Sequence, residues 1–290
     1  MNRPAVLYAL ILAMVAFWSG NYVAGKIALR EFPALLLAGL RISTAGILIV
    51  PVWMLRRKLT VSTPGAWVRL LLLGLFGVTL NQVFFVVGLS RTSVFHSALI
   101  IGLGPLLVLI LACMRGLEKM TARKMAGMLI ALAGLVLLKA FEPSMAGGPT
   151  WLGDCIVFLA ALFFAMFTVF GKETSEQFDS VTVNTVAYVG GGLTMLPVTI
   201  WEASRHSLAH ISAAAWAGVI YMAMFSSVIA YLIYYYALTR IAASRVSAFS
   251  YLQPVFALGL GAAILNERVG MPEIAGGLVI LSGVYLAERG

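Results

Sequence analysis

Hydrophobic residues run along this chain in long stretches that charged and polar residues separate. A helix needs about 20 apolar residues to cross the hydrocarbon core of a bilayer, which is about 30 Å thick. Ten stretches approach this length, so we expect ten membrane-spanning helices joined by short connections. The expected spans cover residues 6–24, 33–55, 68–89, 94–114, 124–138, 151–170, 181–201, 213–238, 244–265 and 271–287.

The composition excludes a water-soluble enzyme. Of the 290 residues, 61% are hydrophobic and 11% are charged, whereas a soluble domain is about 45–50% apolar and about 25% charged. The net charge of +9 would indicate nucleic-acid binding in a soluble protein, but in a membrane protein it describes the connecting loops. We therefore expect the lipid bilayer and a small molecule as partners, and no nucleic acid.

The first stretch, which follows Arg3, also resembles a secretory signal peptide. It has no convincing small-residue cleavage site, and its end recurs 146 positions later. The residues that recur are Phe17, Val23, Gly25 and Lys26, which correspond to Phe163, Val169, Gly171 and Lys172. A cleaved leader has no reason to match a later helix, so we expect a retained first span.

A second match shows that the chain contains an internal repeat. Shifting residues 88–137 by 149 positions places them on 237–286 without a gap. The shift pairs Arg91 with Arg240, Pro105 with Pro254 and Glu118 with Glu267. The sequence therefore predicts two five-helix units, residues 1–145 and 146–290. Because five is odd, the second unit enters the membrane from the opposite face, and inverted repeats of this kind form a substrate site between them.

The positive charges indicate which side of the membrane each loop occupies. Thirteen Lys and Arg residues fall in the connections on one side and six in those on the other. Cytoplasmic loops carry the excess of positive charge, so both termini are expected in the cytoplasm.

Arg41 is the remaining basic residue and lies inside the second expected span. It is eight residues beyond Pro33, or about 12 Å deep at about 1.5 Å per residue. A charge at such depth costs about 2.5–3.5 kcal/mol and should face a wet cavity or a partner. Arg41 is the leading candidate to bind a carboxylate; the alternative is a structural contact with a backbone carbonyl or a distant acid.

Aromatic and amide side chains gather on a few of the spans. The candidates for the wall of a binding cavity are Trp18, Asn81, Gln82, Phe85, Tyr231, Tyr234 and Tyr251. At the offset of 149, Gln82 corresponds to Tyr231 and Phe85 to Tyr234, each pair spaced by three on one helix face. Such walls suit an amphipathic metabolite; an interfacial aromatic belt or ordinary core packing is the alternative.

Asn184 and Tyr188 on the seventh expected span lie roughly where Arg41 lies in the other half. They are candidates either for the cavity wall or for hydrogen bonds that hold membrane helices together.

Two prolines at matching positions predict bends in the fourth and ninth spans, because proline removes a helix hydrogen bond and glycine permits close approach. The candidate hinge residues are Gly102, Gly104, Pro105, Pro254, Gly259 and Gly261. Paired bends in inverted helices could act as gating hinges or remain static.

No pattern for catalysis, a metal or a cofactor appears. The two glutamates of the repeat, Glu118 and Glu267, precede short connections and are expected to stabilise helix starts. Neither Asp nor Glu lies at a span centre, and the motifs that cradle phosphates or activate serines are missing. We therefore expect no cofactor, no metal and no enzyme activity.

Three segments resemble those of EamA-type carriers in the drug/metabolite transporter superfamily. They are WSGNYVAGK at the end of the first span, the stretch from Gly88 to Glu118, and YALTRIAASRVSAFSYLQPVFALGLGAAILNERV before a glycine-rich last span. The resemblance implies a ten-helix carrier of the bacterial inner membrane that exports amino acids, including aromatic ones, or related metabolites by alternating access. Nucleotide sugars, nucleosides and drugs are alternative cargoes, and a non-transporting membrane protein is a further alternative.

Overall fold

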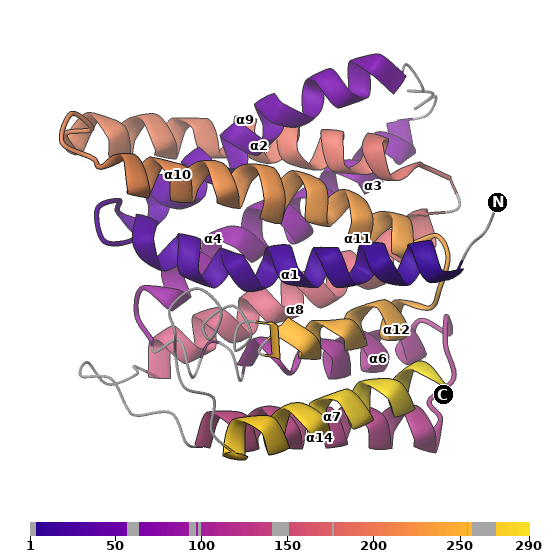
Figure 1. The fold of residues 1–290 in the computed structure, drawn as a ribbon. Helices are drawn as coiled ribbons and strands as arrows, with labels where there is room; N and C mark the ends of the chain where they lie inside the picture. Colours follow the sequence, from indigo (N-terminus) through magenta and orange to yellow (C-terminus); the bar gives the residue numbers. More distant parts are fainter. Residues whose placement is uncertain are drawn as a thin grey trace.

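The computed structural model describes residues 4–56, 64–92, 97, 100–140, 151–175, 177–253, 255–256 and 271–290, and in these ranges the protein is a helical bundle without strands (Figure 1). The helices of the first half are α1 (Pro4–Ala28), α2 (Ala34–Arg56), α3 (Pro64–Gly74), η1 (Leu75–Leu80), α4 (Asn81–Leu89), α6 (Gly104–Met114) and α7 (Ala122–Ala140). Those of the second half are α8 (Trp151–Thr174), α9 (Ser180–Arg205), α10 (Ala213–Tyr221), η2 (Met222–Ile229), α11 (Ala230–Leu238), α12 (Ala243–Ala248), η3 (Phe249–Leu252) and α14 (Met271–Glu288).

Six helical segments of the described part are long and apolar enough to cross a membrane. They are Ala5–Gly25, Ala34–Leu55, Pro64–Leu89, Trp151–Thr174, Ser180–Arg205 and Ala213–Leu238, and each overlaps one of the expected spans. The other four expected spans overlap shorter helices, α7, or residues outside the described ranges. The all-helical prediction is therefore confirmed, with six clear spans.

The third and the sixth of these segments each contain one widened turn. η1 joins α3 to α4, and η2 joins α10 to α11, both with the geometry of a π-helix. The backbone N–H of Asn81 donates to Phe76 O, and that of Ala230 donates to Phe225 O. These two bonds correspond at the offset of 149. Such turns are rare in proteins, but those that occur are often found at functional sites. Both η1 and η2 precede residues that line the cavity described below.

Corresponding helices of the two halves run in opposite directions. α1 begins at the end of the bundle where both termini lie, whereas α8 begins at the other end (Figure 1). α2 and α9, which lie side by side, are likewise antiparallel.

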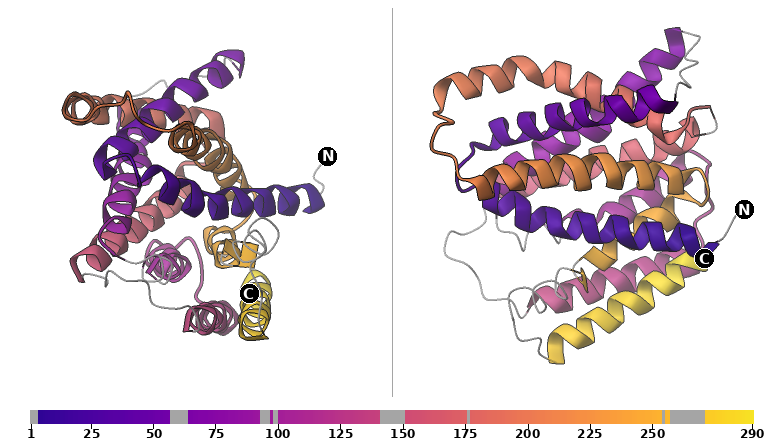
Figure 2. Two further views of the ribbon diagram at one scale, coloured as in Figure 1. Left: turned by 60° about the vertical axis from the view of Figure 1, so that its left-hand side comes forward. Right: turned by 45° about the horizontal axis from the view of Figure 1, so that its top comes forward.

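Most of the packing joins one half to the other. α2 packs along α9, α7 along α14, α4 against α8, and α1 against α10, η2 and α11. Two of these contacts, α2 with α9 and α7 with α14, are called the central pair and the peripheral pair below. In Figure 2 the peripheral pair stands to one side of the other helices.

Small residues let the peripheral pair approach to backbone contact. A Cβ added at Gly283 would lie 2.4 Å from Ala131 N and 2.6 Å from Gly127 O. A Cβ added at Gly134 would lie 3.0 Å from Gly276 O. Lipid tails give apolar helices no reason to associate, so close packing of this kind holds membrane helices together.

The central pair is also close, but it encloses polar side chains. A Cβ at Gly46 would lie 2.9 Å from Tyr188 O, and one at Gly192 would lie 3.3 Å from Ser43 Cα. Arg41, Tyr188 and Asn184 are all buried in this pair. These are the residues whose roles the sequence left open between binding and packing.

Pro105 lies in the first turn of α6, directly after a turn at residues 102–103 that follows the helical residues 100–101. The chain is therefore interrupted beside Gly102, and a proline in the first turn of a helix removes no hydrogen bond from that helix. The role of this break as a gating hinge stays a prediction. The hinge candidates Pro254, Gly259 and Gly261 lie outside the described residues.

Candidate functional site

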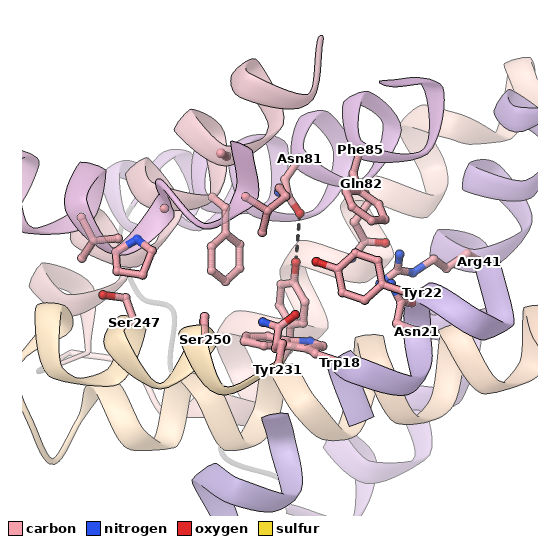
Figure 3. Close-up of a pocket in the computed structure, with 17 residues that line it drawn as sticks. Trp18, Asn21, Tyr22, Arg41, Asn81, Gln82, Phe85, Tyr231, Ser247 and Ser250 are labelled. Carbon is pink, nitrogen blue, oxygen red and sulfur yellow. Dashed lines mark hydrogen bonds between the residues drawn. The ribbon is translucent and has the colours of Figure 1, made fainter. Parts of the chain in front are cut away.

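A cavity lies in the middle of the bundle, where helices of both halves meet (Figure 3). Its volume is about 100 Å³, which is less than that of a typical small-molecule site, about 300–1,000 Å³, so a ligand the size of an amino acid requires the walls to move apart. The residues that line it are Trp18, Asn21, Tyr22, Arg41, Asn81, Gln82, Phe85, Ile101, Gly104, Pro105, Val108, Ala161, Phe164, Tyr231, Ser247, Ser250 and Gln253.

Arg41 brings a positive charge to this cavity from the middle of α2. Its side chain lies beside Asn21, Tyr22 and Gln82 (Figure 3), and the residue is 4% exposed. Its Nε donates a hydrogen bond to Ser227 Oγ at 2.9 Å. No carboxylate in the described ranges forms an ion pair with the guanidinium. A buried charge is costly unless a partner compensates it, so Arg41 is a candidate to bind an anion in the cavity.

Tyr231 connects the two halves across the cavity. Its hydroxyl lies 3.0 Å from Gly77 O, in the widened turn η1, and 3.2 Å from Asn81 Oδ1 (Figure 3). Asn81 in turn donates from Nδ2 to Ala160 O at 2.9 Å. Because hydrogen bonds on both sides fix the amide of Asn81, this wall is preorganised.

Gln82 follows Asn81 on α4 and also lines the cavity. Its Nε2 donates to the hydroxyl of Tyr188 at 2.8 Å, and both residues are buried. Among the described residues, the carbonyl oxygen Oε1 of Gln82 and Oδ1 of Asn21 accept no hydrogen bond. Buried acceptors normally have a partner, so these two atoms are candidates to accept from a ligand.

An aromatic wall completes the site. Trp18 meets Phe164 edge to face at a centroid distance of 5.7 Å and Tyr231 at 6.0 Å, while its indole N–H donates to Ser226 O at 3.0 Å. Edge-to-face contacts of this kind add about 0.5–1.5 kcal/mol to area burial. The wall is therefore rigid and apolar, opposite the amides and Arg41.

The structure brings together many, but not all, of the predicted site residues. Six of them line the cavity: Trp18, Arg41, Asn81, Gln82, Phe85 and Tyr231. The other four are buried behind it: Tyr188, Asn184, Tyr234 and Tyr251. Of the hinge candidates in the described part, Gly104 and Pro105 line the cavity and Gly102 does not.

The four residues behind the wall have other contacts. The Tyr234 hydroxyl lies 2.7 Å from Thr168 Oγ1. Asn184 Nδ2 donates to Ser180 O at 2.7 Å, one turn back on its own helix, and to Tyr231 O of α11 at 3.4 Å. Tyr188 supports Gln82, and the hydroxyl of Tyr251 has no partner among the described residues. Their positions are those of supporting residues.

The model of the EamA-like transporter family matches the chain twice, over residues 5–140 and 151–288. The chain belongs to the EamA-like transporter family. Together with the six apolar spans, this membership makes it a multi-pass membrane protein of a transporter family.

Proteins similar to this EamA-like chain include two that are described as transporters. An uncharacterized transporter of Archaeoglobus fulgidus is 27% identical over 96% of both chains. The uncharacterized transporter YetK of Bacillus subtilis is 26% identical over 96% of this chain and 86% of its own. A WAT1-related chloroplastic protein of Arabidopsis thaliana is 28% identical over 97% of this chain and 69% of its own.

The fold of the EamA-like chain also matches a solved structure. A crystal structure superposes with a TM-score of 0.81 and 18% identity, over 98% of this chain and 97% of the other. At this level of identity the match shows the shared fold.

Sequence reasoning missed several residues of the EamA-like cavity. Phe164 corresponds to Trp18 at the offset of 146, a signal that identifies the two as a pair across the repeat. Ser247 and Ser250 were also missed; with Gln253 they recur every three residues and therefore share one face of the segment that contains α12 and η3. Asn21, Tyr22 and Gln253 belong to the aromatic and amide residues that gather on the spans, and they line the cavity as well.

Glu118 contacts a different helix from the one expected. Its Oε1 accepts from Ser244 N at 3.0 Å and its Oε2 from Lys124 Nζ at 2.6 Å and from Ser244 Oγ. It therefore stabilises the start of α12 in the other half, not only the start of α7. Although burial opposes ionisation, the bonds from Lys124 and Ser244 hold the pKa of Glu118 below its usual value. The corresponding Glu267 lies outside the described residues.

Proposed function

We propose that the protein is a secondary transporter that exports amino acids, aromatic ones among them, or related small carboxylate metabolites by alternating access. The observation that carries the proposal is Arg41, a buried cation on the cavity wall that no described carboxylate neutralises. A cargo carboxylate supplies the missing charge and can accept from the guanidinium in two places.

The rest of the cavity suits the other parts of an amino acid. Asn21 Oδ1 and Gln82 Oε1 are acceptors without donors among the described residues, and an ammonium group has three N–H donors. Trp18, Phe164 and Tyr231 form the apolar wall against which an aromatic or aliphatic side chain packs.

We further propose that the chain has ten spans in two inverted units, residues 1–145 and 146–290. The opposite directions of α1 and α8 support this arrangement (Figure 1), as does the double match to the family model. Contacts in the peripheral pair also support it. Gly127 approaches Gly283 O, and Gly134 approaches Gly276 O. The offset of 149 relates Gly127 to Gly276 and Gly134 to Gly283, so each of these two contacts is the counterpart of the other. Inverted units carry their site at the interface, and rocking of one against the other exposes it alternately.

The proposed orientation places both termini in the cytoplasm of a bacterium, with the spans in its inner membrane. The excess of Lys and Arg in one set of loops supports this orientation, and so do termini at one end of the bundle (Figure 1).

Other cargo classes fit the cavity less well. A nucleotide sugar carries phosphates, and a phosphate clamp uses several cationic or N–H donors. Arg41 is the one cationic side chain that lines the described cavity. Nucleosides and neutral drugs would leave its charge unpaired.

Counterflow in liposomes tests the proposal. Purified protein is reconstituted with an unlabelled solute inside, and uptake of labelled amino acids, nucleosides and sugars is compared. We expect uptake of amino acids and a loss of at least tenfold in the Arg41→Ala variant. The matched control is Arg205→Ala, which removes an exposed arginine that stacks on Trp201 outside the cavity. Counterflow of nucleosides or sugars alone, or full activity of Arg41→Ala, would refute the proposal.

A further inference from the structure

The charge of Arg41 has a consequence for the transport cycle, which rests on the transport function proposed above. An alternating-access carrier closes its cavity twice in each cycle, once around the cargo and once on the way back. With cargo bound, a carboxylate neutralises the guanidinium. On the way back, the same guanidinium is enclosed without it.

The groups around Arg41 are dipoles, not charges. Ser227 Oγ accepts from its Nε at 2.9 Å, and the Tyr188–Tyr231 pair, at 5.5 Å between ring centroids, and the amide of Gln82 lie close by. Hydroxyl and amide oxygens can orient toward a cation but do not cancel its charge.

The six acidic residues whose side chains the structure describes have partners other than Arg41. Glu173 pairs with Arg115, Asp179 accepts from Val181 N and Thr182 N, and Glu202 lies 3.6 Å from His206. Asp154, in the first turn of α8, accepts from Thr92 Oγ1 at 2.5 Å, and Glu118 is held by Lys124 and Ser244. Glu31 accepts from Ser212 N at 2.7 Å in a loop. None of these carboxylates can form an ion pair with Arg41 in the closed cavity without losing its present hydrogen bonds or ion pair.

We propose that Arg41 binds an anion during the return step as well, so that the protein exchanges one carboxylate for another. Closing the protein around an unpaired ion removes the water that solvates it, and this cost is greatest when no counter-charge takes its place. The empty carrier therefore returns slowly. The ligand of the return step is a monovalent anion: a second carboxylate or a halide such as chloride.

Efflux from liposomes separates exchange from net release. Liposomes with the purified full chain are loaded with labelled L-phenylalanine in HEPES buffer free of carboxylates and chloride. Release is followed into the same buffer, or into buffer with unlabelled L-phenylalanine, acetate or chloride. We expect release to be at least tenfold faster into unlabelled phenylalanine than into buffer alone.

The arms with small anions identify the ligand of the return step. Acceleration by acetate but not chloride assigns the site to carboxylates, and acceleration by both assigns it to monovalent anions in general. Equal release in all arms overturns the inference and leaves the transport function intact. Absence of release in every arm overturns the choice of cargo and the inference together.

Two variants test whether the charge itself is responsible. Arg41→Lys keeps the positive charge and should keep the tenfold preference for exchange. Arg41→Gln removes the charge but keeps an N–H donor for Ser227, and its ratio of exchange to net release should fall below threefold, even where its absolute rate is lower. A tenfold preference that persists in Arg41→Gln contradicts the inference. If Arg41→Gln does not fold, the release rates of the unmodified protein in the four buffers still test the inference.

Discussion

The central pair and the peripheral pair join equivalent helices of the two halves in different ways. In the peripheral pair, α7 and α14 touch through glycines and alanines, and none of their residues lines the cavity. In the central pair, α2 and α9 approach almost as closely, yet they enclose Arg41, Asn184 and Tyr188 and contribute a charge to the cavity.

The difference separates two tasks of a membrane bundle. Close backbone packing stabilises the peripheral pair without polar groups. In the central pair, buried polar groups oppose stability unless they are paired, and Arg41 is incompletely paired within the described residues. We therefore expect substitutions to lower stability in the peripheral pair and to trade stability against transport in the central pair.

The largest loss of stability is expected from Gly283→Ala in the peripheral pair. The new Cβ would lie 2.4 Å from Ala131 N, and since that atom is backbone, the helices must separate. Overpacking of this kind costs about 1–3 kcal/mol, measured as a lower free energy of unfolding in detergent. The control is Gly277→Ala on the same helix, where the nearest described atom, in Val255, is 4.0 Å from the Cβ. Both variants gain the same helix propensity, so equal stabilities would contradict the role given to Gly283.

Arg41→Met should produce the opposite change in the central pair. Methionine has a similar length without the charge, and replacing a buried ion by an apolar side chain often stabilises by about 1–4 kcal/mol. We expect a higher unfolding midpoint together with at least a tenfold loss of amino acid counterflow. A variant that loses stability would show that the guanidinium is fully satisfied in the folded protein.

Tyr188→Phe tests the polar contacts of the central pair by removing a single oxygen atom. It removes the hydroxyl that accepts from Gln82 Nε2 at 2.8 Å, and loss of such a bond costs about 0.5–1.5 kcal/mol. The matched control is Tyr235→Phe, because the buried Tyr235 hydroxyl has no partner in the described ranges. Comparable destabilisation of both variants in denaturant titrations would count against the support of Gln82 by Tyr188.

The smallest expected effect is a pH-dependent change in stability. It concerns Glu118 at the edge of the peripheral pair, which forms an ion pair with Lys124 of α7. The pKa of Glu118 is lowered in the folded protein, so its ionised form stabilises the fold at neutral pH. This contribution is present above the unfolded pKa of about 4.3 and is lost as pH falls through the lower folded value. Glu118→Gln should therefore unfold more easily than the unmodified protein at pH 7, with a smaller difference at pH 3. A difference that does not change with pH would refute the ionic role.

The sequence predicted the six clear spans, and it singled out Arg41, Asn81 and Gln82, which line the cavity, for physical reasons. Long apolar stretches identify membrane helices because the bilayer requires their length. Arg41 stood out because a charge without a nearby acid is rare at that depth. Asn81 and Gln82 were found because two adjacent amides are conspicuous in an apolar helix.

The remaining assignments depend on neighbours that the sequence does not specify. Tyr231 and Tyr234 are three residues apart on one face, yet Tyr231 lines the cavity and Tyr234 contacts Thr168 of α8. Asn184 binds the carbonyl of Ser180 on its own helix, an alternative open to any asparagine in a helix. Phe164 resembles core residues until Trp18 is placed against it. The start of α6 at Gly104 was also not predicted, because a proline in an apolar run fits either a bend or a beginning.

The widened turns η1 and η2 also bear on how the protein evolved. A π-turn holds one more residue than an ordinary turn, so its simplest origin is the insertion of a single codon. A shift of 149 positions carries η1 onto residues 224–229, inside η2. Under the two-unit arrangement proposed above, a single insertion that preceded the doubling of the unit accounts for both turns.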